Sequence, residues 1–333
     1  MTAIRQDIDQ ANMKFQRVAL VVSLLLFGIK VAAYEITNSN AILTDALEGL
    51  VNILGAAFGL FSLYYATLPR DKNHPYGHGK IEFISSGFEG VLILVAGGSM
   101  IAKAGYAFFF PEEVNINAIG LTLVTVAGLI NYLMGYSMVK QGEKVNSVQL
   151  KAGGKHLISD GYSTVGLLIG LGIVWITDFD LLDNVLAGIL GLIIAVTGYK
   201  IIRESISGIM DEADPEQIAK VSSTLESKRR PAWVDIHNFR IVRYGAKIHM
   251  DAHLTLPWYY TLKESHDEVN ALEQVLDDAF QKDVEASIHT EPCLPKSCEI
   301  CELANCKERK FEFVKRVEWN VDHILDDEHH GVD

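Results

Sequence analysis

Two ionisable side chains stand at the start of a long apolar stretch, residues 157–176. His156 and Asp160 are four residues apart, so on a helix they share one face. Ionisable groups within a membrane span are costly and usually face the interior of a helix bundle. An imidazole nitrogen beside a carboxylate oxygen suits a divalent cation such as zinc. A metal-free pair at the membrane surface is the alternative, and these two residues alone leave both interpretations open.

A second polar set interrupts another apolar stretch, residues 41–66. Asp45, Glu48 and Asn52 are spaced i, i+3, i+7, which again is one helical face. Two carboxylates on one face of an apolar helix indicate contact with other helices rather than with lipid. We therefore predict one metal site formed by Glu48, Asn52, His156 and Asp160, with Asp45 as an auxiliary residue. A polar packing cluster without metal is the alternative.

The loop between the second and third apolar stretches carries a further candidate site. Asp71, His74 and His78 have a spacing typical of metal ligands, and Gly77 and Gly79 permit tight turns. A solvated basic loop would be the plainer interpretation.

All cysteines of the chain fall within one short segment. Cys293, Cys298, Cys301 and Cys306 follow the pattern C-x₄-C-x₂-C-x₄-C, which predicts a thiolate site that favours Zn²⁺. A redox-active or inert thiol cluster is the alternative, because the spacing matches no standard zinc knuckle. The segment 322–330 is acidic and rich in histidine, and we expect a flexible tail with weak metal affinity.

Hydropathy and charge predict where these residues lie. Six apolar runs are each near the ~20 residues that a helix needs to cross ~30 Å of hydrocarbon: about 15–36, 41–66, 83–110, 118–139, 157–176 and 181–202. Lysine and arginine occur at the N-terminus and in every second loop, which predicts that both termini are cytoplasmic. The net charge of −13 argues against nucleic acid as a partner.

The second half of the chain predicts a small soluble domain. We expect helices over 215–228 and 261–280 and strands over 235–244, 247–256 and 284–290. The order α-β-β-α-β suits a ferredoxin-like sheet with helices on one face. The second helix should bury an apolar face made of Leu262, Val269, Leu272, Val275 and Leu276.

These features together resemble the cation diffusion facilitator family, over residues 15–292. The resemblance rests on six spans, the polar second span, the loop His-Pro-Tyr-Gly-His-Gly-Lys, the His-x-x-x-Asp of the fifth span and the soluble domain. It implies a homodimeric metal-cation/proton antiporter of the cell (inner) membrane. It also implies a charge interlock between Lys80 and Asp211 that holds the dimer together near the membrane surface. Metal ligands between protomers are implied at five positions of the soluble domain: His237, His253, His266, His289 and Glu291.

One departure from the family pattern concerns the second span. The family usually has His or Asp followed by Asp, whereas this chain has Glu48 and Asn52. Both differences give the site harder donor atoms. Mn²⁺ and Fe²⁺ are therefore candidate substrates as well as Zn²⁺ and Co²⁺.

The predicted architecture is an all-α membrane bundle of six helices plus a cytoplasmic α+β ferredoxin-like domain. The boundaries are 1–211 for the bundle, 212–292 for the domain and 293–333 for a Cys-rich and acidic tail. The predicted function is efflux of a divalent cation, with Zn²⁺ favoured, in exchange for protons. The rivals are a membrane metal sensor and an intramembrane metalloenzyme. The sequence lacks a His-Glu-x-x-His motif, which argues against the enzyme.

Overall fold

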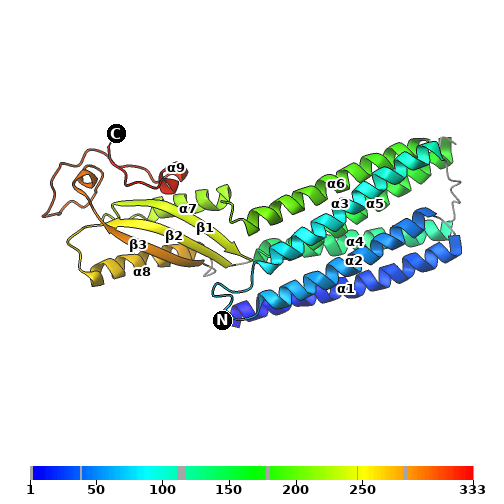
Figure 1. Cartoon of the computed structure of the whole chain (residues 1–333), viewed down its shortest axis with the longest axis horizontal. Helices are drawn as coiled ribbons and strands as arrows, with labels where there is room; N and C mark the ends of the chain where they lie inside the picture. Colours follow the sequence, from blue (N-terminus) through cyan, green and yellow to red (C-terminus); the bar gives the residue numbers. More distant parts are fainter. Residues whose placement is uncertain are drawn as a thin grey trace. The chain divides into compact units, whose positions relative to one another are not determined.

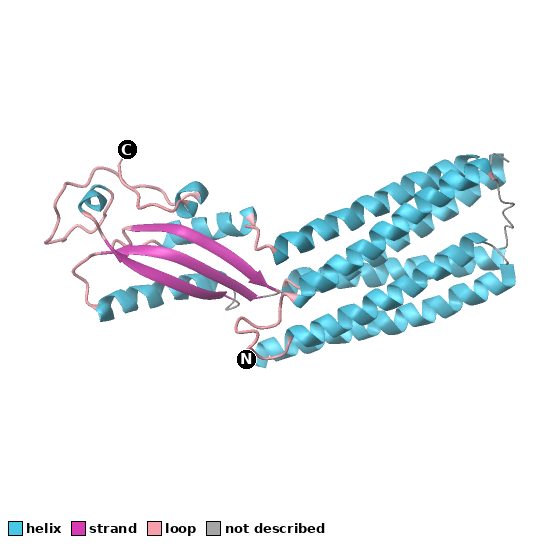
Figure 2. Cartoon of the chain, in the orientation of Figure 1, coloured by secondary structure: helices cyan, strands magenta, loops and turns pink. Residues whose placement is uncertain are grey.

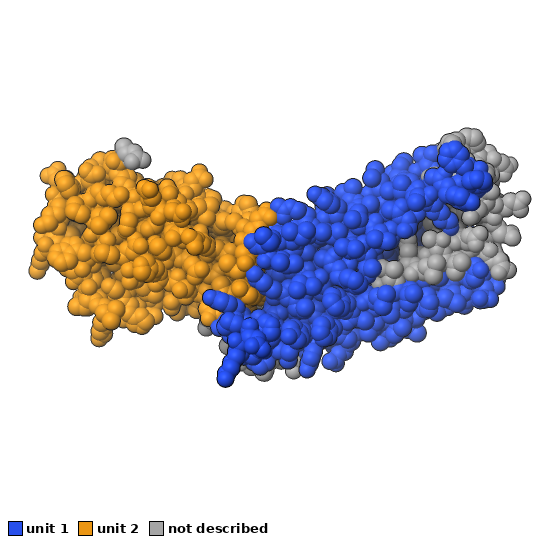
Figure 3. Space-filling model, viewed as in Figure 1, with its two compact units in different colours: residues 1–210 blue, residues 211–333 orange. Residues whose placement is uncertain are grey.

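The chain forms two compact units, Met1–Met210 and Asp211–Asp333 (Figure 3). The computed structural model describes residues 3–37, 40–110, 118–177, 181–245, 247–280 and 284–332. At some positions inside these helices only the backbone is described, and Asp45 and Glu48 are among them.

The first unit contains six long helices within the described residues, as the apolar runs predict (Figure 1). They are α1 (Ala3–Thr37), α2 (Asn40–Ala66), α3 (Ile81–Phe109), α4 (Ala118–Val145), α5 (Val148–Thr177) and α6 (Leu181–Ile209). Three of the described stretches are long and apolar enough to cross a membrane: Asn12–Glu35, Ile81–Ala107 and Leu121–Val145. Leu25, Val95 and Leu133 are more than half exposed, at 63%, 60% and 55%. Such an apolar outer surface suits contact with lipid.

Close backbone contacts hold these helices in pairs, α3 with α6 and α4 with α5. A Cβ added at Gly198 of α6 would lie 2.6 Å from the backbone nitrogen of Leu94 in α3. A Cβ added at Gly135 of α4 would lie 2.7 Å from the carbonyl oxygen of Gly154 in α5. Small residues therefore let the backbones approach closely, as is common in membrane bundles.

The second unit contains a three-stranded sheet with two long helices (Figure 2). Its elements are α7 (Pro215–Lys228), β1 (Asp235–Tyr244), β2 (Lys247–Leu256), α8 (Leu262–Ala279), β3 (Val284–Pro292), a 3₁₀ turn (Pro295–Glu299) and the short helix α9 (Val321–Leu325). β1 pairs antiparallel with β2, and β2 pairs parallel with β3 through the α8 crossover. The predicted α+β fold and its α-β-β-α-β order are confirmed.

Local sequence signals account for the helix starts in this unit. The Asp214 side chain accepts hydrogen bonds from the backbone nitrogens of Glu216 and Gln217, and Pro215 occupies the first helical position of α7. Thr261 and Glu264 form a reciprocal capping box at the start of α8. These caps explain why both starts could be predicted to within a residue.

Two expectations for this unit were wrong. Leu262 is 88% exposed, because it stands in the first turn of α8, whereas Leu272 and Leu276 farther along the helix are fully buried. The acidic tail does not extend freely. Trp319 and Ile324, exposed by 1% and 0%, belong to the same hydrophobic core as the sheet and the long helices. These two large apolar side chains anchor a segment whose composition is otherwise polar.

Candidate functional site

The predicted site between α2 and α5 is partly assembled by the described side chains. The amide of Asn52 lies between His156 and Asp160. Its Nδ2 donates to Asp160 Oδ2 at 2.5 Å, and its Oδ1 lies 2.5 Å from His156 Nε2. Asn52 and His156 are buried, and Ile93 of α3 and Ile194 of α6 line the same small space. The structure does not describe the side chains of Glu48 and Asp45.

The two ring nitrogens of His156 have different surroundings. When Nε2 carries a proton, His156 donates to the Asn52 oxygen, and the other ring nitrogen has no partner among the described side chains. The Asn52 amide thus connects the imidazole of α5 to the carboxylate one helical turn farther along the same helix.

Glu89 of α3 is a buried carboxylate that sequence reasoning missed. It is 3% exposed, and its Oε2 has no hydrogen-bond partner in the described part of the chain. Its carboxylate oxygens lie 3.3–3.5 Å from the positions that a Cβ would occupy at Gly55 of α2 and Gly153 of α5. Those glycines are three residues from Asn52 and His156, one helical turn toward the loop ends of α2 and α5. The sequence signal that could have identified Glu89 is a single glutamate within an apolar run.

The three loop residues that we predict as metal ligands lie close together in the structure. Asp71, His74 and His78 offer ligand atoms that all lie within 4.8 Å of one another. His74 Nδ1 is 3.1 Å from Asp71 Oδ1, and His78 Nε2 is 3.4 Å from Asp71 Oδ2. His78 is buried against the ring of Tyr65, whereas Asp71 and His74 are exposed. Two of the three side chains are therefore open to solvent.

Backbone geometry prepares Asp71 for this role. The backbone N–H groups of His74 and Asn73 donate to its Oδ1, and these hydrogen bonds lower the pKa of the Asp71 carboxyl. Gly77, at a φ of +97°, closes the turn through a hydrogen bond to the His74 carbonyl. The loop therefore presents an anionic carboxylate.

In the second unit, histidines from all three strands of the sheet lie next to one another. The strand register pairs His237 with His253 and His253 with His289, one from each strand. Glu291 of β3 lies among them: Oε1 is 3.0 Å from His253 Nδ1, and Oε2 is 3.4 Å from His237 Nε2. His289 lies at the rim, 3.8 Å from Glu291 and 67% exposed. His266 is exposed on α8 and belongs to none of the clusters of three within the described residues.

The tail adds ligands that sequence reasoning did not assign to this cluster. His329 Nε2 is 2.8 Å from Glu291 Oε2, and His323 Nε2 is 2.8 Å from Asp235 Oδ1. His330 Nδ1 is 3.1 Å from Asp235 Oδ2. Burial would raise the pKa of Asp235, but its interactions with the surrounding histidines outweigh burial and hold the pKa well below its usual range. Asp235 is therefore anionic at neutral pH.

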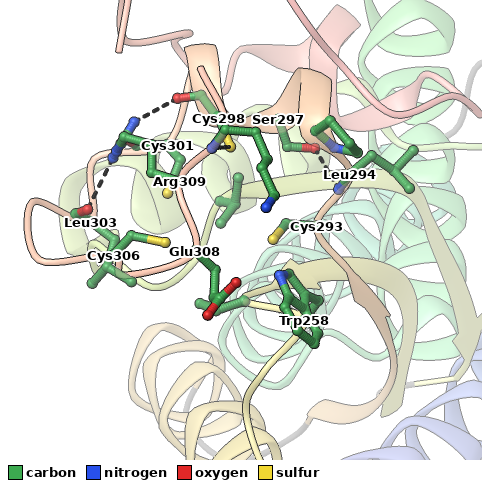
Figure 4. Close-up of a pocket in the computed structure, with 14 residues that line it drawn as sticks. Trp258, Cys293, Leu294, Ser297, Cys298, Cys301, Leu303, Cys306, Glu308 and Arg309 are labelled. Carbon is green, nitrogen blue, oxygen red and sulfur yellow. Dashed lines mark hydrogen bonds between the residues drawn. The ribbon is translucent and has the colours of Figure 1, made fainter. Parts of the chain in front are cut away.

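The four cysteines are free thiols that line one pocket (Figure 4). Arg309 crosses the segment and donates to the carbonyl oxygens of Cys298, Cys301 and Leu303. Burial raises the pKa of the Cys293 and Cys301 thiols. Among the described residues, no group of three ligand atoms within 4.8 Å includes a cysteine. The four-thiolate site thus stays a prediction, and binding would require the sulfurs to move together.

The interlock between Lys80 and Asp211 also stays a prediction, because these residues belong to different units. Within the first unit, Lys80 Nζ is 3.5 Å from the carbonyl oxygen of Ile209.

Both units of the chain match known protein domains. Residues 17–210 match the cation efflux transmembrane domain, and residues 213–293 match the cytoplasmic domain of cation efflux proteins. The chain is 30% identical over 254 residues to an uncharacterized transporter of Synechocystis, covering 76% of this chain and 82% of that protein. It is 26% identical over 281 residues to the manganese efflux system protein MneS of Bacillus subtilis, covering 83% and 93%.

A further relative is the cation-efflux pump FieF of Shewanella oneidensis, which is 23% identical over 282 residues and covers 83% of this chain and 92% of that protein. The transmembrane match spans more than half of the chain, and the helices α2 to α8 and the three-stranded sheet lie within the two matched ranges. The chain therefore belongs to the cation diffusion facilitator family, whose members are membrane transporters of metal cations and not enzymes.

Proposed function

We propose that this protein exports a divalent metal cation from the cytoplasm in exchange for protons. The cation binds Glu48, Asn52, His156 and Asp160 between α2 and α5. The observation that carries this proposal is the buried amide of Asn52, which contacts both His156 and Asp160 across the two helices. Two carboxylates in the proposed set balance the charge of one M²⁺, so that protons can displace it.

Proton coupling follows from the chemistry of the ligands. A metal ion needs a neutral imidazole and anionic carboxylates, so protons from the outer side compete for the same atoms. The bundle would bind metal when open inward and protons when open outward, as secondary transporters do about a midplane site. The proton gradient then drives the return of the protonated site.

The identity of the metal follows from the donor set. One imidazole nitrogen and three oxygens, one of them from a neutral amide, suit a harder cation than a nitrogen-rich site would. The Bacillus subtilis relatives MneS and MneP carry manganese in their names. We therefore propose Mn²⁺ as the first substrate to test, with Zn²⁺, which the sequence favours, and Fe²⁺ and Co²⁺ as competitors.

The loop site fits this scheme as a collecting point on the cytoplasmic side. The loop lies between basic residues such as Arg70 and Lys80, and the positive-inside rule puts this loop and both termini in the cytoplasm. Asp71, His74 and His78 would hold metal near the inner end of α2. The match to the cytoplasmic domain of cation efflux proteins supports a homodimer.

The full-length protein in proteoliposomes tests the proposal. We expect a metal-sensitive dye trapped in the vesicles to report Mn²⁺ or Zn²⁺ movement. This movement should accelerate when a proton gradient drives protons in the opposite direction, and it should slow when an ionophore dissipates that gradient. A membrane metal sensor would bind the same ions and move none. Metal flux that does not change with the proton gradient would overturn the antiport mechanism.

A further inference from the structure

Seven side chains of the soluble unit form one continuous cluster of possible metal ligands. Its three groups are Asp235, His237 and His329; Asp235, His323 and His330; and His237, His253 and Glu291. Within each group the ligand atoms lie within 4.8 Å of one another. Shared members, Asp235 and His237, join the groups. Four of the seven side chains come from the sheet and three from the C-terminal tail.

Contacts outside the cluster hold the tail in place. The Ser222 hydroxyl donates to the carbonyl of Trp319 at 2.6 Å, and the Arg229 guanidinium stacks 4.2 Å from the Trp319 ring. The backbone nitrogen of Asn238 donates to the Asp326 carbonyl at 2.6 Å, at a bulge in β1. Ile324 is fully buried. The tail histidines are therefore positioned by packing and not by the cluster alone.

The cluster leaves a deeply buried nitrogen without a hydrogen bond. His237 is 1% exposed, and its Nδ1 has no partner within the described residues although it lies 3.5 Å from Asp235 Oδ2. Its Nε2 lies 3.4 Å from Glu291 Oε2, an oxygen that also lies 2.8 Å from His329 Nε2. Two ligand atoms at ~2.0–2.1 Å from a tetrahedral ion lie ~3.3 Å apart, and the two distances from His237 are closer to this value than to the length of a hydrogen bond.

The tail imidazoles are arranged for the same chemistry. The rings of His323 and His330 stack at 3.4 Å with an angle of 22° between them, and each directs a nitrogen at Asp235.

We propose that the C-terminal tail completes a divalent-cation site in which Asp235, His323 and His330 bind one ion. This position lies beside the group of His237, His253 and Glu291, with His329 between the two. A cation bound there ties the tail to β1, so that tail docking strengthens as cytoplasmic metal rises. The imidazole-rich donors select a transition-metal cation such as Zn²⁺ over Mg²⁺ or Ca²⁺. The site does not depend on the proposed transport mechanism.

Metal stoichiometry of the full-length protein in detergent tests the site. Stripped protein is titrated with Zn²⁺ and, separately, with Co²⁺, and bound metal is measured by mass spectrometry after dialysis. We expect the double variant His323→Gln and His330→Gln to bind one ion fewer per chain than the wild type. The control is His249→Gln, which removes an imidazole of β2 outside the cluster and should keep the full metal content.

Proteolysis of the tail supplies a second readout. Lys310, Lys315 and Arg316 are exposed just before the docked segment. Zn²⁺ should slow tryptic cleavage there in the wild type and in the control, but not in the double variant. The single variant His330→Gln alters the most exposed of the three proposed ligands, so it still tests the site if the double variant misfolds. Equal metal content and equal protection in wild type and both variants would mean a hydrogen-bonded cluster only, and would overturn the proposal.

Discussion

Asn52 is the neutral member of the proposed transport ligands, and it contacts both of its described partners. A side-chain amide has an NH2 group that donates and a carbonyl oxygen that accepts, so it can connect an imidazole N–H to a carboxylate. Asp160 then supplies the only negative charge among the described side chains of the site. At the scale of single residues, function should therefore depend most on Asp160 and be tuned by Asn52.

Replacement of Asp160 tests the first point. Asp160→Ala removes an anionic ligand, and we expect metal flux in proteoliposomes to fall to background, with affinity weakened by more than ~10-fold. Glu143→Ala is the matched control, because it removes a carboxylate from an exposed position on α4. Near-normal flux through Asp160→Ala, with the protein inserted and dimeric, would rule out this transport site.

Asn52→Asp tests the second point. The change adds a titratable group within 2.5 Å of Asp160, so it adds charge and proton affinity together. We expect tighter metal binding, a changed order of preference among Mn²⁺, Zn²⁺ and Co²⁺, and a transport optimum at higher pH because the second proton must leave first. Competition assays at several pH values measure both effects. Identical profiles for variant and wild type would put Asn52 outside the ligand set.

At the scale of elements, the site depends on how α2, α3 and α5 pack. Gly55 and Gly153 leave room for the Glu89 carboxylate, and these glycines lie one helical turn from Asn52 and His156. Buried carboxylates in a membrane bundle usually lie on an ion or proton path. We therefore predict that Glu89 lies on the path of the cation between the loop and the proposed site.

Glu89→Gln keeps the shape of this side chain and removes its ionisable carboxyl group. We predict a several-fold lower initial rate of flux at limiting metal, with a smaller effect at saturation. Glu82→Gln in the same helix is the comparison, because Glu82 is also buried but accepts a hydrogen bond from the Ser147 hydroxyl at 2.7 Å. That variant should lose stability instead. Unchanged flux for Glu89→Gln would remove Glu89 from the path.

The α3–α6 pair gives a stability prediction. Gly198→Ala would bring its Cβ within 2.6 Å of the Leu94 backbone, and we expect a loss of about 1–3 kcal/mol, typical of overpacking. Gly98→Ala in α3 gains the same methyl group with no described atom within 4 Å. It should be neutral or slightly stabilising because alanine favours helix. Thermal unfolding in detergent compares the two, and equal melting temperatures would contradict the tight packing.

At the scale of the whole molecule, the proposed transport site and the candidate metal sites of the cysteines and of the sheet histidines lie in separate units. The cysteine pocket lies in the soluble unit, and a closed four-thiolate site would offer no open position for exchange. We expect it to be structural or regulatory and to adjust transport without being required for it.

Substitution of all four cysteines by serine tests this expectation. Full-length wild type under reducing conditions should bind Co²⁺ with thiolate charge-transfer absorption, and the variant should lack that absorption while it retains most of its metal flux. Binding should weaken as pH falls, because burial raises the pKa of the Cys293 and Cys301 thiols and metal must displace their protons. Wild type without the absorption would show that the pocket binds no such ion.

The sequence by itself determined whatever depends on local spacing. Apolar runs gave the six helices, and helical periodicity aligned His156 with Asp160 on one face of α5. The loop ligands Asp71, His74 and His78 are close in sequence, and their turn depends on Gly77. Side-chain caps marked the starts of α7 and α8. In each case the interaction spans a few residues, so the pattern along the chain carries it.

Only the tertiary structure decided which distant segments meet. The contacts of Asp235 with His323 and His330 join residues 88 and 95 positions apart, and no periodicity in the chain encodes that return. Glu89 reads as a lone acid in an apolar run until the packing of α2 and α5 surrounds it. The four cysteines are dense in sequence, yet the fold places them around a pocket rather than at one point. Packing free energy, carried by side chains such as Trp319 and Ile324, selects these long-range contacts.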